Sequence, residues 1–287
     1  MIRDRWRWHR AWRGMRRIAA TDPGLGACSW RGREGRLYAV GCEALRDPAA
    51  LQAALGDWRA RLPQAGEVLS RTRSHTVYRL ETAAYGPVVL KRVEPTKPHR
   101  RYAIPSLFAG WRLHRALPGS VPRPLGALER YGAWGQLQEA WLLARYEPGR
   151  SLRARLGDPG QRPATELARA LGAYLARVHD AGVLFRDAHP ENVLVRAAPS
   201  PDEPRFSLID LDALLPGRPS PLERLKLLKK LELPEPEQGA MVAAYWQTTA
   251  SRPLPLLQGF LERVYYPVKR VRRRWVAWLR SRCASSS

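Results

Sequence analysis

The stretch from Val183 to Leu214 constrains the fold of this chain more than any other. It reads VLFRDAHPENVLV, then a polar gap, then FSLIDLDALL. Short runs of β-forming apolar residues on either side of a polar gap predict a small antiparallel hairpin. Asp187 and Asn192 lie beside the first run, and Asp210 directly follows the end of the second run, Phe206–Ile209. The pattern therefore predicts that two carboxylates and an amide meet at one end of the hairpin.

Side chains grouped in this way suit phosphoryl transfer from ATP. One carboxylate would orient the acceptor hydroxyl and take its proton, which makes Asp187 the candidate catalytic base. An amide and a second carboxylate would hold the magnesium ion that bridges the phosphates, so Asn192 and Asp210 are the candidate metal ligands. The Asn stands five positions after the Asp, as in a kinase catalytic loop. The alternative is a polar turn in an unrelated sheet.

The sequence VHDAGVLFRDAHPENVLV resembles the catalytic loop of protein-kinase-like folds. Within it, RDAHPENVLV is especially similar to bacterial lipopolysaccharide core kinases and aminoglycoside-type phosphotransferases. The resemblance covers residues 67–250 and implies an α+β, two-lobed protein-kinase-like fold, with a β-rich N-lobe and a mainly helical C-lobe. It implies ATP and Mg²⁺ as cofactors. The expected units are a basic N-terminal extension (1–66), an N-lobe with its hinge (67–149), a C-lobe (150–262) and a basic amphipathic C-terminal helix (263–287).

Lys91 is the candidate phosphate-binding residue of the N-lobe. Residues 67–93 predict three strands, and Lys91 lies in the third, where the resemblance places the lysine that contacts the α and β phosphates. The alternative is an edge-strand lysine facing solvent. Gly110 stands where the family's helix carries a Glu that pairs with this lysine, so the sequence leaves Asp210 or ATP itself to orient it. The turn at 70–75 has no glycine to let its backbone approach phosphates closely.

The resemblance also implies roles for further residues. Residues 145–149 are similar to the interlobe hinge, whose backbone would bind adenine. His189 stands where protein kinases usually carry a phosphate-contacting Lys, so it is a candidate phosphate or substrate contact, or else a turn residue. Asp212 fits a variant of the metal-binding motif in the lipopolysaccharide kinase family. No Ala-Pro-Glu segment follows, which argues against a peptide-docking groove, and LERLKLLKKL and AAYW are again similar to that family.

The charge of the chain implies an anionic partner. The net charge is +23, from 49 Lys and Arg against 26 Asp and Glu, which fits a nucleic acid, a membrane surface or a phosphorylated substrate. Beyond charge there is no recognised nucleic-acid motif, so we expect no specific nucleic acid. The three cysteines fit no metal spacing, and neither a transmembrane-length apolar run nor a signal peptide is found. We therefore expect a cytoplasmic protein.

Both ends of the chain combine arginine with tryptophan. The first 17 residues carry seven Arg, one Asp and three Trp, and Trp8, Trp12 and Met15 follow helical spacing. They predict an amphipathic helix in a lipid headgroup layer, with a helix docked on the N-lobe or a solvated tail as alternatives. Residues 263–282 hold eight basic and no acidic residues, and 268–279 form an apolar face with two Trp. This segment predicts attachment to an anionic leaflet, or else packing on the C-lobe.

These observations predict a kinase that phosphorylates a sugar of the lipopolysaccharide inner core, a heptose or Kdo, on the inner face of the inner membrane. Its partners would be the lipopolysaccharide core or a lipid-linked sugar and an anionic membrane surface. A protein or small-molecule kinase of the same superfamily is an alternative. Two alternatives come from different classes: a catalytically weak kinase-like scaffold, because the helix Glu is missing, and a basic nucleic-acid binder, for which charge is the only signal.

Overall fold

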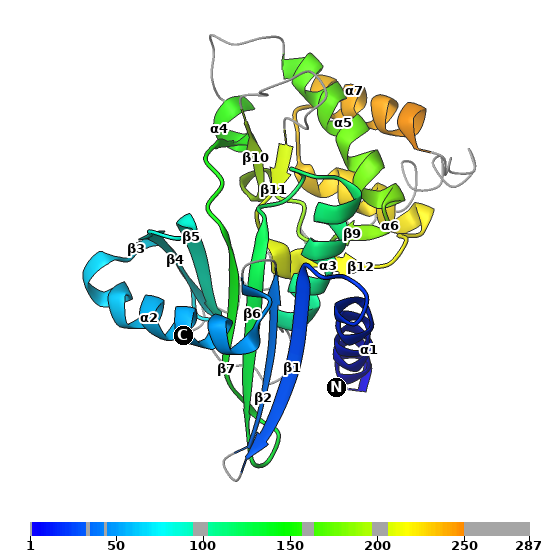
Figure 1. The fold of residues 1–287 in the computed structure, drawn as a ribbon. Helices are drawn as coiled ribbons and strands as arrows, with labels where there is room; N and C mark the ends of the chain where they lie inside the picture. Colours follow the sequence, from blue (N-terminus) through cyan, green and yellow to red (C-terminus); the bar gives the residue numbers. More distant parts are fainter. Residues whose placement is uncertain are drawn as a thin grey trace, which may run out of the picture.

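The computed structural model describes residues 2–32, 35–42, 45–93, 103–156, 164–196 and 206–249. Over these ranges a large sheet flanked by helices leads into a smaller, mainly helical part (Figure 1). The predicted α+β class, with a β-rich N-terminal and a helical C-terminal part, is confirmed. The predicted C-terminal helix at 263–287 lies outside the described residues.

The N-terminal part is built on one antiparallel sheet with the order β1-β2-β6-β7-β5-β4-β3. Strand β2 pairs with β6, so the segment predicted as an extension contributes its first hairpin to the sheet of the N-lobe. The strands are β1 (Leu25–Gly32), β2 (Gly35–Cys42), β3 (Glu67–Arg71), β4 (His75–Thr82), β5 (Gly86–Val93), β6 (Pro124–Gly132) and β7 (Leu137–Arg145). The helices of this part are α1 (Ile2–Ala19), α2 (Pro48–Ala65) and α3 (Ala103–Ala116).

The sheet is buried on both faces, and the two-residue period of its strands divides the side chains between them. Along β7, Trp141 and Leu143 face α2, whereas Ala140, Leu142 and Ala144 belong to the core on the α3 side. Figure 1 shows α2 on one side of the sheet and α1 with α3 on the other. The apolar runs of these strands therefore reflect burial on both faces.

The start of helix α2 is capped by a side chain. Asp47 is its N-cap, and its carboxylate accepts hydrogen bonds from the backbone N–H groups of the two residues after Pro48, at 3.1 and 3.4 Å. Leu51, Leu55 and Trp58 are buried at helical spacing and pack on the sheet. The cap fixes the start of the helix, and the apolar stripe fixes the face that covers the sheet.

Helix α1 is docked on the N-lobe. Met15 is fully buried and Trp12 is 8% exposed, with the Trp12 ring edge-on to Tyr38 at a centroid distance of 5.1 Å. A Cβ atom at Gly14 would lie 2.9 Å from the Phe108 ring, so α1 approaches α3 through a residue without a side chain. Of the alternatives for this segment, the structure shows the helix docked on the N-lobe, with Trp12 and Met15 turned toward the core. The side chain of Trp8 lies outside the described residues.

The C-terminal part places short strands between helices. The predicted hairpin is confirmed: β10 pairs antiparallel with β11, and β9 pairs with β12. The elements are β8 (Arg150–Ser151), α4 (Leu152–Leu156), α5 (Ala164–Asp180), β9 (Val183–Phe185), η2 (Pro190–Asn192), β10 (Val193–Val195), β11 (Phe206–Leu208), η3 (Leu211–Ala213), β12 (Leu214–Pro216), α6 (Pro221–Leu228), η4 (Lys229–Leu231) and α7 (Glu235–Thr248).

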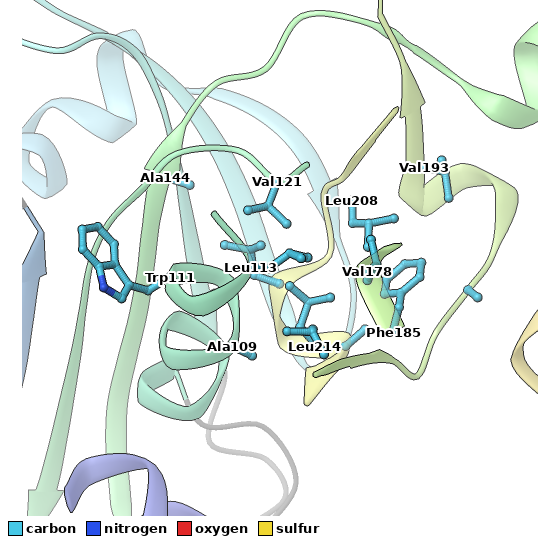
Figure 2. Close-up of a cluster of buried hydrophobic side chains, with 14 of the residues drawn as sticks. Ala109, Trp111, Leu113, Val121, Ala144, Val178, Phe185, Val193, Leu208 and Leu214 are labelled. Carbon is cyan, nitrogen blue, oxygen red and sulfur yellow. The ribbon is translucent and has the colours of Figure 1, made fainter. Parts of the chain in front are cut away.

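One hydrophobic core runs from α3 to the strands of the predicted catalytic loop. Figure 2 shows Leu113 of α3 facing Val121 on one side and the cluster of Phe185, Leu208 and Leu214 on the other. Phe185, the last residue of β9, is fully buried there. The core therefore holds the loop residues that follow β9 and β11 against the N-lobe.

A buried polar network ties α5, α6 and α7 together just before the catalytic loop. Arg224 is 2% exposed, and its Nη1 donates to Asp180 Oδ1 at 2.8 Å and to Thr249 Oγ1 at 2.7 Å. The hydroxyl of Tyr245 also accepts from Arg224 and lies 2.7 Å from Nδ1 of His179. Burial, helped by the Arg224 charge, lowers the pKa of His179 to about 3. The network therefore fixes the end of α5 with a neutral imidazole.

Candidate active site

A cleft of about 490 Å³ lies between the N-terminal sheet and the predicted catalytic hairpin. It brings together four of the five candidate residues, Lys91, Asp187, Asn192 and Asp210, from segments far apart in the sequence. The rest of its wall comes from strands β3, β4, β5 and β7, from the segment predicted as the hinge and from the hairpin: Leu69, Ser70, His75, Val77, Val89, Pro122, Leu142, Ala144, Arg145, Tyr146, Glu147, Gly149, Leu194, Ile209 and Leu211.

Lys91 points into this cleft from the middle of the sheet. Its strand β5 lies between β4 and β7, and the residue is 8% exposed, so the edge-strand alternative is wrong. The neighbouring Leu90 faces α2, and alternation along the strand turns Lys91 to the opposite face. The Nζ atom lies 2.6 Å from Asp210 Oδ1. Of the two groups left to orient the lysine, the structure thus shows the carboxylate in contact with it.

The catalytic loop is held by its own backbone. Asn192 donates from Nδ2 to the carbonyl oxygen of Asp187 at 3.1 Å, and the His189 N–H donates to the same oxygen at 2.8 Å. The N–H of Ile209 donates to the Asn192 carbonyl at 3.1 Å, which joins the loop to the end of β11. These bonds fix Asp187, Asn192 and Asp210 relative to one another. The three residues therefore lie close together in space as well as in the local sequence.

The residues present fit a magnesium ion shared with a nucleotide. Within the described part of the chain, no group of three or more His, Cys, Asp and Glu side chains could hold a metal unaided. Magnesium in phosphoryl-transfer sites is usually bound through one or two protein groups and the substrate phosphates. Because the Asn192 amide is oriented by its Nδ2 bond, its oxygen and the Asp210 carboxylate provide oxygen donors of that kind. The structure describes the backbone at Asp212, as part of η3, but not its side chain.

Asp187 and His189 lie at the mouth of the cleft. Their side chains are 44% and 50% exposed, and His189 Nε2 is 4.0 Å from Asp187 Oδ1. Both groups are therefore within reach of a molecule that approaches from solvent. A candidate base for an acceptor hydroxyl must be reachable from solvent in this way, because it has to come within hydrogen-bond distance of the proton it takes.

Hydroxyl groups support the turn that lacks glycine. Thr72 Oγ1 accepts from the backbone N–H groups of Ser74 and His75, both at 3.2 Å, and lies 3.2 Å from Nδ1 of His75. Ser70 and His75 line the cleft. The turn between β3 and β4 is therefore braced by side chains and presents polar groups where a glycine-rich loop would present backbone.

An ion pair that sequence reasoning missed fastens the hinge to the C-lobe. Glu147 of the hinge pairs with Nη1 of Arg196, whose Nη2 donates to the Gly119 carbonyl at 2.6 Å. Burial raises the pKa of Glu147, and the Arg196 charge opposes that shift. Glu147 is the only acidic residue among positions 145–149, and this was the sequence signal that could have pointed to it. Its partner follows β10, and nothing local in the sequence identifies it.

Helix α3 meets the metal-binding segment at Gly110. A Cβ atom there would lie 3.4 Å from both terminal methyl groups of Leu211, the residue after Asp210. The helix has no acidic residue. The buried acid beside it is Glu129 on β6, which sequence reasoning also missed. It is fully buried and accepts from the Ile104 N–H at 2.8 Å, so it caps the first turn of α3.

Comparison with known proteins agrees with this fold. The model of the phosphotransferase enzyme family, APH, matches residues 65–183, from the start of β3 to the start of β9. The structure of WaaP in complex with acyl carrier protein superposes with a TM-score of 0.54 at 21% identity, over 80% of this chain and 91% of that one. The chain has a protein-kinase-like fold. The resemblance inferred from the catalytic loop and the two-lobed architecture are both confirmed.

Two other kinase-like structures share less of the fold. A Stt7 homolog from Micromonas algae, soaked with ATP, matches at 19% identity over 62% of this chain and 68% of that one, with a TM-score of 0.38. The PknI kinase domain of Mycobacterium tuberculosis matches at 18% identity over 52% and 60%, with a TM-score of 0.34. These two likenesses are too weak to support further inference. No curated protein sequence matches the chain.

The kinase-like fold supports phosphotransfer as the kind of reaction. The sheet of the N-lobe supplies Lys91, the C-lobe supplies Asp187, Asn192 and Asp210, and the hinge closes the back of the cleft between them. In the described ranges no helix is both long and apolar enough to cross a bilayer.

Proposed function

We propose that this protein transfers the γ-phosphoryl group of ATP to a sugar hydroxyl, on a heptose or Kdo, of the lipopolysaccharide inner core. The observation that carries the phosphotransfer is the cleft in which Lys91, paired with Asp210, faces Asp187 and Asn192. The choice of acceptor is supported by RDAHPENVLV, which is similar to the lipopolysaccharide core kinases, and by the missing Ala-Pro-Glu segment.

ATP would enter with its base toward the hinge. The walls there are apolar, with Val89, Leu142 and Ile209, and the hinge backbone supplies hydrogen-bonding groups for the adenine edge. Lys91 would contact the phosphates as a desolvated positive charge, which is worth more in a water-excluded cleft than in bulk water. Asn192 and Asp210 would hold magnesium, which supplies charge neutralisation on the transferred phosphoryl group.

Asp187 would act on the acceptor. A bond forms between the acceptor oxygen and the γ-phosphorus, the bond from that phosphorus to the β–γ bridging oxygen breaks, and the acceptor proton goes to the Asp187 carboxylate. The bonds from Asn192 Nδ2 and the His189 N–H to the Asp187 carbonyl keep the carboxylate in place. This positioning supplies much of the rate in phosphoryl transfer, because the protein does little covalent chemistry.

The path beyond Asp210 suits a large acceptor. Helix α6 begins at Pro221, so only ten residues separate it from Asp210. A segment of that length leaves no room for a long activation loop that would select peptides. Attachment to the inner face of the inner membrane belongs to this proposal, with the basic residues 263–282 as its anchor. A lipid-linked acceptor requires the enzyme to work at that surface.

The deciding experiment measures transfer of radiolabelled phosphate from ATP to purified core-containing lipopolysaccharide, with casein and nucleosides as competing acceptors. We expect label on the lipopolysaccharide and none above background on the others. Label on casein or on a nucleoside alone would replace the proposed acceptor by a protein or small molecule. The absence of transfer to every acceptor, together with the absence of ATP hydrolysis, would favour a kinase-like scaffold.

A further inference from the structure

A lysine from outside the catalytic loop touches its backbone beside the candidate base. Lys230 belongs to η4, between α6 and α7, and its Nζ donates to the carbonyl oxygen of Arg186 at 2.7 Å. Arg186 directly precedes Asp187, so the ammonium lies next to the base although 44 residues separate the bonded pair. Lys230 and His189 are not among the residues that line the nucleotide cleft. The phosphates of ATP therefore give no reason for a cation at this place.

Exposed basic side chains lie around this contact, together with the acids Asp187, Glu191 and Glu232. Arg186, His189 and Lys230 are all exposed. Of the nearby acids, Glu191 is paired with Arg153 at 3.0 Å, and the Asp187 carboxylate faces the His189 ring. The contact with a carbonyl uses one of the three donors of the ammonium group, so Lys230 can bind another acceptor or turn toward it.

We infer that Lys230, with Arg186 and His189, forms a subsite for an anionic group, a phosphate or carboxylate, that the acceptor carries near the hydroxyl oriented by Asp187. The inference rests on the proposed function, since it names the acceptor class of the same site. A hydrogen bond from an ammonium group to an exposed neutral carbonyl contributes little free energy. A bond from the same group to an anion is charge-assisted and roughly twice as strong as a bond between neutral groups. A flexible lysine that bonds the carbonyl of the residue before the base can exchange this contact for a bond to the anion.

The use of lysine in the chain agrees with this role. Only six residues are Lys, and three of them, Lys226, Lys229 and Lys230, fall in the short segment that reaches the catalytic loop. The last turn of this segment is held by Glu232, which adopts a left-handed conformation with φ of 48°. A non-glycine residue there costs about 1 kcal/mol, so the surrounding packing determines this backbone and with it the position from which Lys230 reaches Arg186.

The first test compares acceptors with and without the anion. Initial rates of transfer are measured on core lipopolysaccharide as purified, after phosphatase treatment and after methyl esterification of its carboxylates, which separates the two sources of charge. We expect Lys230→Gln to raise KM about tenfold for the intact acceptor and less than twofold for the form that has lost the recognised anion, since one charge-assisted bond corresponds to about a factor of ten.

The matched control is Lys229→Gln, which removes the same charge one position away and is expected to leave KM within about twofold, as for an exposed charge outside a site. An equal rise of KM for the intact and the anion-free acceptors in Lys230→Gln would overturn the subsite. So would an equal effect of the two lysine variants, because net charge would then explain the result.

The second test needs no transfer. Inorganic phosphate is titrated into the full chain with the cleft filled by a non-hydrolysable ATP analogue and magnesium, and the His189 ring proton is followed by NMR, assigned with His189→Gln. We expect a saturating shift whose midpoint rises about tenfold in Lys230→Gln, for the same charge-assisted bond. A shift without any transfer to lipopolysaccharide would support the subsite and refute the proposed acceptor. The absence of a shift in the wild type would overturn the subsite even if lipopolysaccharide is phosphorylated.

Discussion

Lys91 Nζ lies 2.6 Å from Asp210 Oδ1, and this contact joins the sheet of the N-lobe to the segment that follows β11, where the candidate metal ligand Asp210 stands. Their side chains are 10% and 18% exposed, so each charge is largely removed from water and is balanced by the other. Kinases that carry a Glu on the N-lobe helix can hold the lysine from that side. Here α3 carries no carboxylate, and Asp210 is in contact with the lysine from the other side of the cleft.

The first prediction concerns this lysine. Lys91→Met removes the positive charge that would contact the phosphates and leaves Asp210 without this partner. Turnover should therefore fall by about a hundredfold, and KM for ATP should rise. Steady-state kinetics of transfer from ATP measure both. Arg92→Met is the matched control, because it removes a charge from the neighbouring exposed position on the same strand. If the two variants behave alike, Lys91 does not act on the phosphates.

The second prediction separates the two carboxylates. Asp187→Ala should reduce turnover by at least about a hundredfold while Mg-ATP still binds, because the base acts only on the acceptor. Asp210→Ala should weaken nucleotide binding in the presence of magnesium and have less effect in its absence, because its carboxylate acts through the metal. Calorimetric titration with ATP measures binding, and Glu191→Ala serves as an exposed control. Residual transfer at the wild-type rate in both variants would remove the enzyme assignment.

The sequence predicts those parts of the site that are local. Asp187 and Asn192 are five residues apart, and hydrogen bonds inside the loop turn that spacing directly into geometry. Lys91 was identified by the resemblance, because consecutive strands with short turns allow the third strand of the lobe to be recognised along the chain. Its contact with Asp210, 119 residues away, could not be counted in this way.

The contacts that sequence reasoning missed join distant segments. Glu147 and Arg196 are 49 residues apart, and Lys230 and Arg186 are 44 apart. Each pair is decided by how lobes and helices pack, and a single charged residue carries no signal about its partner. Helix α1 shows the same limit, because an amphipathic pattern predicts that one face is covered but does not say by what. In this protein β1 and α3 cover it.

The third prediction concerns Gly110. Gly110→Ala should leave stability within about 1 kcal/mol, because a methyl group meets Leu211 at an ordinary contact distance of 3.4 Å and improves helix propensity. Gly110→Glu should destabilise the protein by about 3 kcal/mol or more, since the carboxylate would be buried against Leu211 and Pro124. Urea unfolding measures both. A stable Gly110→Glu variant with higher activity would mean that the new carboxylate reaches Lys91.

The fourth prediction concerns acid stability. The pKa of His179 is lowered to about 3 in the folded protein, whereas an unfolded histidine titrates near 6.5. Between these pH values the unfolded chain binds a proton that the folded protein does not. The free energy of unfolding therefore falls as the pH drops below about 6.5, and at pH 5 this group alone lowers it by about 2 kcal/mol. His179→Gln can still bond Tyr245 and should flatten this dependence. Urea midpoints at pH 7, 6 and 5 provide the comparison, and an unchanged slope in the variant would show that His179 is not the group responsible.

The fifth prediction separates docking of α1 from membrane binding. Trp12 is buried against Tyr38, so Trp12→Ala should lower the free energy of unfolding by about 3 kcal/mol. Gly14→Val should also destabilise, because its side chain would meet the Phe108 ring. The exposed Arg13, changed to Gln, is the control and should stay within about 0.5 kcal/mol of the wild type.

Vesicle co-sedimentation at low and high salt completes this test. Folded Trp12→Ala should bind anionic vesicles as well as the wild type, because the side chain it removes faces the core. A chain that ends at Tyr266 should lose most of that binding, since it lacks the basic residues from 268 onward. Binding of the wild type should weaken as salt rises, because exposed charges are screened over about 8 Å at physiological ionic strength. If Trp12→Ala keeps its stability but no longer sediments with anionic vesicles, α1 leaves the sheet at the membrane and its apolar face binds lipid.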